Sequence, residues 1–237
     1  MSLTYLVLNL CIIAVPVWYT LDKRTAYYRR LPALGFSIAV VSTCYLLWDI
    51  LVTARGEWSF NGKYLTGIQI LNIPLEEVLF FVTVPYSCLF IYEVVLYATK
   101  SSKFKLPASV VVATILALIA ASLAFYPQGY TAKALASCGF FLLLAFLFDR
   151  PLIESKQYWI WLAICYVPFV IINTVLTALP VVEYNSRAIW GLRIGTIPLE
   201  DFFYNFAMLS FYLLAYRLAK SWTSATERAN LKSLPRG

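Results

Sequence analysis

Two pairs of adjacent acids are the residues best placed to do chemistry in this sequence. Glu76 and Glu77 end the segment IPLEE, and Glu200 and Asp201 end the segment IPLED. The chain contains no histidine, the side chain most often used as a general acid or base. Proton transfer by this protein therefore falls to carboxyl groups, and two carboxyls held in different environments can act as an acid/base pair.

The two acidic segments belong to an internal repeat. A constant offset of 124 residues aligns Gly67 with Gly191 and the segment IPLEE with IPLED. Because the alignment needs no gap, we interpret it as a duplicated structural unit rather than a chance match between two short segments.

Composition indicates an integral membrane protein. Of the 237 residues, 61% are hydrophobic and 13% are charged, whereas soluble domains carry about a quarter charged residues. A membrane-spanning helix takes about 20 mostly apolar residues, so the apolar runs predict an all-α polytopic protein with about seven transmembrane helices. The predicted spans cover residues 3–21, 33–54, 74–97, 107–126, 132–148, 158–181 and 198–219.

The repeat predicts how these spans are organised. Three spans followed by one linking span return the chain to its starting side, so the second repeat inserts in the same orientation as the first. The two parallel three-helix repeats then bring both acidic segments to one side of the membrane, facing each other across a single interface. The predicted units are residues 1–97 (first repeat), 98–131 (linking transmembrane helix), 132–221 (second repeat) and 222–237 (basic tail).

The basic residues predict the orientation. With the N-terminus outside, inner loops and the C-terminal tail carry 14 Lys and Arg residues and outer loops carry 5, as the positive-inside rule requires. We expect the first span to stay in the protein as a transmembrane helix and not to be cleaved as a signal peptide. We also expect the protein to lie in the plasma (inner) membrane, with its cytoplasmic C-terminal tail on anionic lipid headgroups. The net charge of +7 does not form a patch of the kind that binds nucleic acid.

Polar residues within the spans extend the acidic group. Asp49 lies five residues before the end of its predicted span, on the order of 7.5 Å from the boundary where the acids lie, and Asn173 is its repeat partner. Acids at a helix start also have a purely structural use, because the helix N-terminus attracts negative charge. Adjacent acids project about 100° apart, so which acid of each pair faces a cavity stays open. Glu93 lies near the inner end of its span, where we expect it to extend to the interface.

We expect this cluster to share a proton at neutral pH, with one neutral carboxyl able to donate and another able to accept. Aromatic side chains beside the acids are candidates for substrate contact, since aromatic faces stabilise cations, although aromatic residues also belong at membrane interfaces. These candidates are Trp48, Phe80, Phe81, Phe203 and Tyr204.

The extended segments IPLEEVLFF and IPLEDFFYNF resemble the paired PxE(E/D) motifs of the heterodimer-type carotenoid cyclases, in the fused form. The resemblance covers nearly the whole length, from the first span to the seventh. It implies a non-redox lycopene cyclase that needs neither flavin nor metal, and the sequence has no G-x-G-x-x-G dinucleotide loop.

The resemblance also implies a mechanism. A neutral carboxylic acid protonates the terminal alkene of lycopene or a related acyclic carotenoid, a nearby double bond closes the ring, and proton loss yields a β-ionone ring. The expected acid/base set is Glu76, Glu77, Glu200 and Asp201, with Asp49 and Asn173 orienting it.

Other functions stay open from the sequence. A carotenoid hydratase would let water capture the same cation, and a proton-coupled transporter would also use acids within spans. A prenyltransferase is disfavoured because no D-x-x-x-D stretch occurs, and a retinal protein is disfavoured because the seventh span has no lysine before Lys220. Whether the protein oligomerises stays open too.

Overall fold

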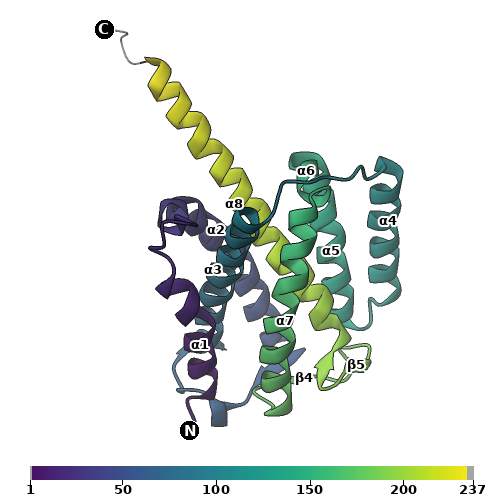
Figure 1. Cartoon of the computed structure of the whole chain (residues 1–237). Helices are drawn as coiled ribbons and strands as arrows, with labels where there is room; N and C mark the ends of the chain where they lie inside the picture. The colour runs from purple at the N-terminus through teal and green to yellow at the C-terminus, as the bar shows by residue number, and fades with distance from the viewer. Residues whose placement is uncertain (1, 234–237) are drawn as a thin grey trace.

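The computed structural model describes the backbone of residues 2–233 and the side chains of residues 2–222. Most of this part of the chain is helical (Figure 1). The α-helices are α1 (Thr4–Trp18), α2 (Leu31–Ala54), α3 (Leu75–Ala98), α4 (Ala108–Ala124), α5 (Gly129–Phe148), α6 (Arg150–Ile153), α7 (Lys156–Ala178) and α8 (Leu199–Ser233). Between them lie the 3-10 helices Tyr27–Arg30 and Gly62–Tyr64 and the strands β1 (Trp58–Phe60), β2 (Gln69–Ile70), β3 (Ile73–Pro74), β4 (Val182–Tyr184), β5 (Arg193–Ile194) and β6 (Ile197–Pro198).

Within residues 2–233, four helical segments are long and apolar enough to cross a membrane: Tyr27–Ala54, α3, α5 and α7. Helices α1 and α4 are apolar but shorter. Large apolar side chains cover the outside of the bundle; Val15, Leu116 and Val167 are each more than 60% exposed. Such a surface is unusual for a soluble protein. The structure confirms a helical, membrane-like fold, while the number of seven spans stays a prediction.

The long helices coincide with the predicted apolar runs, with small differences at their ends. Helix α5 begins at Gly129, three residues before the predicted start, and α8 continues past residue 219 to Ser233. The short helix α6 was not predicted. Of the basic tail predicted at 222–237, the side chains beyond Trp222 lie outside the described residues.

Helices from the two halves of the sequence pack against each other. Helix α2 packs mainly on α8 and α7 on α3, whereas α1 packs on α3 and α5 on α8. Figure 1 shows α1 and α5 beginning at the same end of the bundle, where the N-terminus, β4 and β5 lie. A buried apolar core that includes Phe81, Leu89, Phe141, Trp161 and Tyr212 joins these helices. Because α3 and α8 also begin at this end, both acidic segments lie there.

The loops that follow α2 and α7 pair through strands β1 and β4, in a register that is unchanged when the two halves are exchanged. Strands β1 and β4 are antiparallel, with Trp58 opposite Tyr184 and Phe60 opposite Val182. The offset of 124 residues relates Trp58 to Val182 and Phe60 to Tyr184, so exchanging the two halves reproduces the same pairs. Self-complementary pairing of this kind is how two equivalent units meet at a twofold axis.

The segment before each acidic helix start also repeats in its backbone. Strand β2 pairs with β3 directly before α3, and β5 pairs with β6 directly before α8. Gly67 and Gly191 have φ values of 85° and 92°, a region that glycine enters without steric cost. The first amide of each helix donates to the carbonyl seven residues earlier, at 2.9 Å in both halves. The sequence repeat therefore corresponds to two loops of the same conformation.

The opposite end of the bundle holds a buried acid among basic groups. Glu93 is 7% exposed and accepts hydrogen bonds from the Tyr216 hydroxyl and the Lys220 ammonium, each at 2.6 Å. Arg30 Nε lies 3.9 Å from its other oxygen. The expectation that Glu93 extends to the interface is wrong, because side chains of the neighbouring helices hold the carboxylate inside.

This cluster should contribute measurably to stability. Glu93→Gln keeps an acceptor for Tyr216 but removes the negative charge beside Lys220, and we expect a loss of about 1–3 kcal/mol in the free energy of unfolding. The matched control is Glu154→Gln, which breaks the more exposed pair with Arg150 and should cost less than about 1 kcal/mol. The midpoint of thermal unfolding in detergent measures both; equal shifts would show that the buried cluster stabilises no more than a surface pair.

Candidate active site

The two acidic segments form matching helix starts. Pro74 and Pro198 end strands β3 and β6, and the helices begin at the next residue. Pro74 has extended backbone angles and is the last residue before α3, where proline's missing amide hydrogen removes no helix bond. Both acids of each pair therefore lie in the first helical turn, and they project in different directions.

The first acid of each pair binds the backbone of the preceding loop. Glu76 Oε1 accepts from the Thr66 amide at 2.6 Å, and Glu200 Oε1 accepts from the Trp190 amide at 2.5 Å. Both amides lie ten residues before their acid, so the contact repeats between the halves. Glu200 Oε1 also accepts from the Thr131 hydroxyl at 2.6 Å. Glu76 and Glu200 are 0% and 1% exposed, and this geometry fixes the loops to the helix starts.

The second acid of each pair binds tyrosine hydroxyls instead. Tyr5, on α1, donates to Glu77 Oε2 at 2.6 Å. Tyr130, on α5, donates to Asp201 Oδ1 at 2.7 Å, and Tyr184, on β4, donates to Asp201 Oδ2 at 2.8 Å. Burial and the neighbouring Asp201 carboxylate raise the pKa of Tyr184 well above its usual value, so its hydroxyl keeps the proton that it donates.

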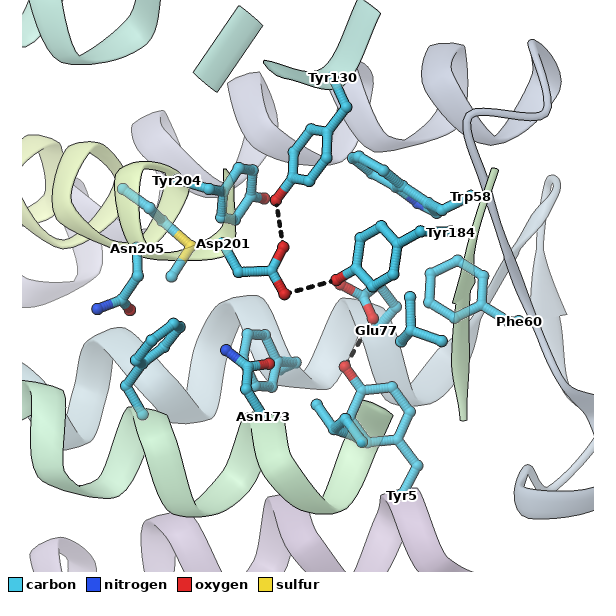
Figure 2. Close-up of a pocket in the computed structure, with 15 residues that line it drawn as sticks. Tyr5, Trp58, Phe60, Glu77, Tyr130, Asn173, Tyr184, Asp201, Tyr204 and Asn205 are labelled. Atoms are coloured by element: carbon cyan, nitrogen blue, oxygen red, sulfur yellow. Dashed lines mark hydrogen bonds between the residues drawn. The ribbon is translucent and has the colours of Figure 1, made fainter. Parts of the chain in front are cut away.

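Glu77 and Asp201 line one cavity between the two halves. Figure 2 shows their carboxyl groups entering it from α3 and α8, with the three tyrosines around them. The cavity has a volume of about 80 Å³ and a mostly apolar lining. Its aromatic and polar walls include Trp58, Phe60, Phe80, Phe169, Asn173, Tyr204 and Asn205. Glu76 and Glu200 are not among the lining residues.

The two predicted orienting residues lie in different places. Asn173 lines the cavity. Asp49 does not, although Trp58 Nε1 donates to Asp49 Oδ1 at 2.8 Å and Trp58 is a wall of the cavity. Asp49 is 2% exposed, and its other oxygen has no hydrogen-bond partner among the described residues. The structure therefore connects Asp49 to the cavity through one indole ring.

The predicted aromatic contacts divide as well. Phe80 and Tyr204 line the cavity. Phe81 is 1% exposed and packs in the core, and Trp48 stacks on Tyr45 with ring centroids 5.5 Å apart. Phe203 lines a separate apolar pocket beside α4 and α5. The turn of the helix separates Phe80 from Phe81 just as it separates Glu76 from Glu77.

Sequence reasoning missed the tyrosines that bind the acids. Tyr5 and Tyr130 are 125 residues apart and precede their acids by 72 and 71 residues. Because their separation differs by one residue from the repeat offset of 124, a gapless alignment does not place the two tyrosines opposite each other. A search for a tyrosine near the start of the first span in each half would have found both. Tyr184 had no such signal, because its position depends on the pairing of β1 with β4.

Among the described residues, no cluster of three or more Cys, Asp, Glu or His side chains is placed to hold a metal ion. The hydrogen-bond donors that line the cavity are tyrosine hydroxyls, asparagine amides and the Trp58 indole. They are suited to orienting carboxyl groups.

The family described as lycopene cyclase matches this chain over residues 2–95 and 127–219, which is more than half of its length. The chain belongs to the lycopene cyclase family. The two matched regions contain both acidic segments and the three tyrosines that bind them.

Two curated relatives match a shorter part of this lycopene cyclase family member. Both are named bifunctional lycopene cyclase/phytoene synthase; the one from Phycomyces blakesleeanus is 47% identical over 58 residues and the one from Neurospora crassa is 34% identical over 58 residues. In each case the match covers 24% of this chain and 10% of the relative, so the chain spans about a tenth of the length of these relatives. No solved structure matched the chain.

The loop-binding role of Glu200 can be tested through stability. Glu200→Ala leaves the Trp190 amide and the buried Thr131 hydroxyl without their acceptor, which should cost about 1–3 kcal/mol for each donor left unpaired. Glu200→Gln keeps an oxygen at the same position and should cost less. The midpoint of thermal unfolding in detergent compares the two variants. An equal loss for Gln and Ala would show that the charge, and not the acceptor oxygen, holds the loop.

Proposed function

We propose that this protein is a non-redox lycopene cyclase, an intramolecular lyase or isomerase of carotenoid biosynthesis that closes the acyclic end groups of lycopene, or a related acyclic carotenoid, to β-ionone rings. The observation that carries this proposal is the pair Glu77 and Asp201, which face one apolar, aromatic cavity from equivalent positions in the two halves. Membership of the lycopene cyclase family supports the same activity.

The hydrogen bonds distinguish the two acids. Both oxygens of Asp201 accept from phenols, an arrangement that favours the ionised, acceptor-only form. Only one oxygen of Glu77 accepts from a phenol, and its other oxygen has no hydrogen-bond partner among the described residues, so it is available to carry a proton. Glu77 is therefore the acid in this proposal, and Asp201 is the base.

The proposed reaction transfers one proton in and one proton out. Glu77 donates its proton to the terminal alkene, which leaves a tertiary carbocation. A neighbouring double bond of the substrate attacks that carbon, the ring bond forms, and the positive charge moves to a ring carbon. Asp201 removes a proton from the adjacent ring carbon. The electron pair of the broken C–H bond then forms the ring double bond. No electrons leave the substrate, so the reaction is an isomerisation, and the proton returns to Glu77 before the next turnover.

The cavity walls suit a carbocation. The rings of Trp58, Phe60, Phe80 and Phe169 line the space beside the two acids, and an aromatic face stabilises a desolvated cation by about 2 kcal/mol or more. The pairing of β1 with β4 places Trp58 and Tyr184 across the end of the cavity. Such a cover limits the water that would otherwise capture the cation.

The layout of the protein in the membrane is part of the proposal. Two parallel three-helix repeats, related by a pseudo-twofold axis along the membrane normal and linked by α4, account for the register of β1 and β4. Seven spans in the plasma membrane, with the N-terminus outside and the C-terminus cytoplasmic, place the acids near the outer surface. The distribution of basic residues supports this orientation.

The two acids of the cavity can be tested with isosteric substitutions. Expressed in a lycopene-accumulating bacterium, the unmodified chain should form cyclic pigment, and Glu77→Gln or Asp201→Asn should lower ring formation by at least about 100-fold, the scale of general acid/base catalysis. Glu76→Gln and Glu200→Gln are matched controls and should retain most activity. Pigment analysis by chromatography and mass spectrometry measures ring formation.

Each outcome of this experiment has a distinct meaning. Unchanged lycopene from an inserted, unmodified chain would contradict cyclase activity. A hydroxylated product would identify a hydratase, and retained activity in Glu77→Gln and Asp201→Asn would contradict the assignment of the acids. Proton-driven solute uptake without any pigment change would favour a transporter.

The Tyr184 hydroxyl, which binds Asp201 from β4, should affect the rate of ring formation. Tyr184→Phe removes one of the two donors to Asp201, and we expect a loss of about tenfold or more in the rate of ring formation, the scale of a hydrogen bond to a charged group. Tyr97→Phe is the control, because Tyr97 is 65% exposed and lies near the other end of α3, about 30 Å from Glu77 at 1.5 Å per residue. Equal rates for both variants would show that Tyr184 does not support the base.

A further inference from the structure

An apolar groove continues from the carboxyl cavity along the bundle. It has a volume of about 370 Å³ and is lined by residues of α1, α3, α7 and α8. The groove and the cavity share the lining residues Phe80, Phe169, Asn173 and Asn205, so the two spaces adjoin. On α3 the groove extends from Phe80 to Ile91, about 16 Å at 1.5 Å per residue.

We infer that this groove holds the polyene chain of the substrate while one end group lies between Glu77 and Asp201. The inference rests on the proposed function, and it adds the place where the rest of the hydrocarbon binds. The lining is apolar, with residues such as Ile12, Val15, Val84 and Ile172, so burying a hydrocarbon there is favourable. The outer faces of α1 and α7 beside the groove carry exposed Val15 and Val167, which lets a membrane-dissolved substrate enter from the side.

The internal repeat contains two equivalent clefts, and it explains why only one of them is suited to the polyene chain of the substrate. The offset of 124 residues relates the cleft between α3 and α7 to the one between α8 and α2. Ser87 in the groove corresponds to Phe211, and Ile172 corresponds to Trp48. At these two positions, large rings occupy the second cleft where small or aliphatic side chains line the first.

Ring contacts show that the second cleft is filled. Phe211 lies 5.8 Å from Phe140 and 5.7 Å from Phe141 on α5, and 6.4 Å from Tyr45 on α2, measured between ring centroids. Tyr45 in turn stacks on Trp48. With one open cleft, the two acids act on one end group of the substrate in each binding event. Cyclisation of the other end group requires the substrate to leave and bind again in the reverse direction.

A second apolar pocket of similar volume, about 380 Å³, lies beside α4 and α5. It shares no lining residue with the carboxyl cavity. The Tyr166 hydroxyl donates to the Phe202 carbonyl at 2.7 Å, and the Phe169 and Phe202 rings lie 5.1 Å apart. These residues lie between the cavity and that pocket, so the groove along α1 is the one that continues the site.

Two neighbouring positions on α7 provide a matched test. Ile172→Trp introduces the side chain that the other half has at this position and fills the groove, whereas Ile171 is 59% exposed on the outer face, so Ile171→Trp adds the same bulk outside it. In proteoliposomes with lycopene we expect Ile172→Trp to lower the initial rate of ring formation by about ten- to a hundredfold. Ile171→Trp should stay within about twofold. Monocyclic product should appear before bicyclic product.

Native cysteines give a binding test that needs neither turnover nor substitution. Cys11 lines the groove, Cys44 is on α2 outside it, and both are exposed. Lycopene should slow alkylation of Cys11 by N-ethylmaleimide at least about fivefold and leave Cys44 unchanged, as mass spectrometry of the full chain measures. Protection of Cys11 without ring formation would support the groove and contradict the proposed function. Ring formation without such protection, and with equal rates for both tryptophan variants, would overturn the groove and leave the function standing. Protection by lipid alone, with no further effect of lycopene, would assign the groove to acyl chains and overturn the inference.

Discussion

A carboxyl group inside a membrane protein is stable only if the protein supplies hydrogen-bond donors in place of water. This constraint organises the acidic end of the bundle. Glu76 and Glu200 receive donors from backbone amides of the loops that precede their helices, while Glu77 and Asp201 receive them from tyrosines on other elements. An amide donor ties an acid to its own loop. A phenol at the end of a long side chain leaves space beside the acid, and the cavity lies there.

Equivalent loops and strands of the two sequence halves adopt matching conformations, but the site is not symmetric. The pairing of β1 with β4 and the loops before α3 and α8 match between the halves. Around the cavity, the side chains at equivalent positions differ: Glu77 corresponds to Asp201, and Asn173 corresponds to Asp49. One phenol binds Glu77 and two bind Asp201. In the proposed mechanism, these unequal surroundings allow one acid to donate a proton while the other accepts one.

The two ends of the bundle serve different purposes through similar contacts. At the end with the strands, tyrosines bind carboxyls that face a cavity. At the other end, Tyr216 and Lys220 bind Glu93, and Arg217 pairs with Asp149 at 2.6 Å, with no cavity acid involved. These contacts join α8 to α3 and to the end of α5. Helices α3 and α8 each contribute residues to both ends.

Sequence alone determined the features that depend on composition and on short-range pattern. Apolar runs marked the helices, because burying backbone in lipid requires helical hydrogen bonding, and the gapless repeat marked both acidic helix starts. The sequence also placed the acids within one helical turn of Pro74 and Pro198. Tertiary structure decided which acid of each pair faces the cavity, since that depends on the rotation of α3 and α8 against their neighbours. It also decided that Tyr184 reaches Asp201, that Glu93 is buried, and that one of two equivalent clefts is open. Each of these follows from contacts between residues far apart in the chain, and no periodicity within a single helix contains that information.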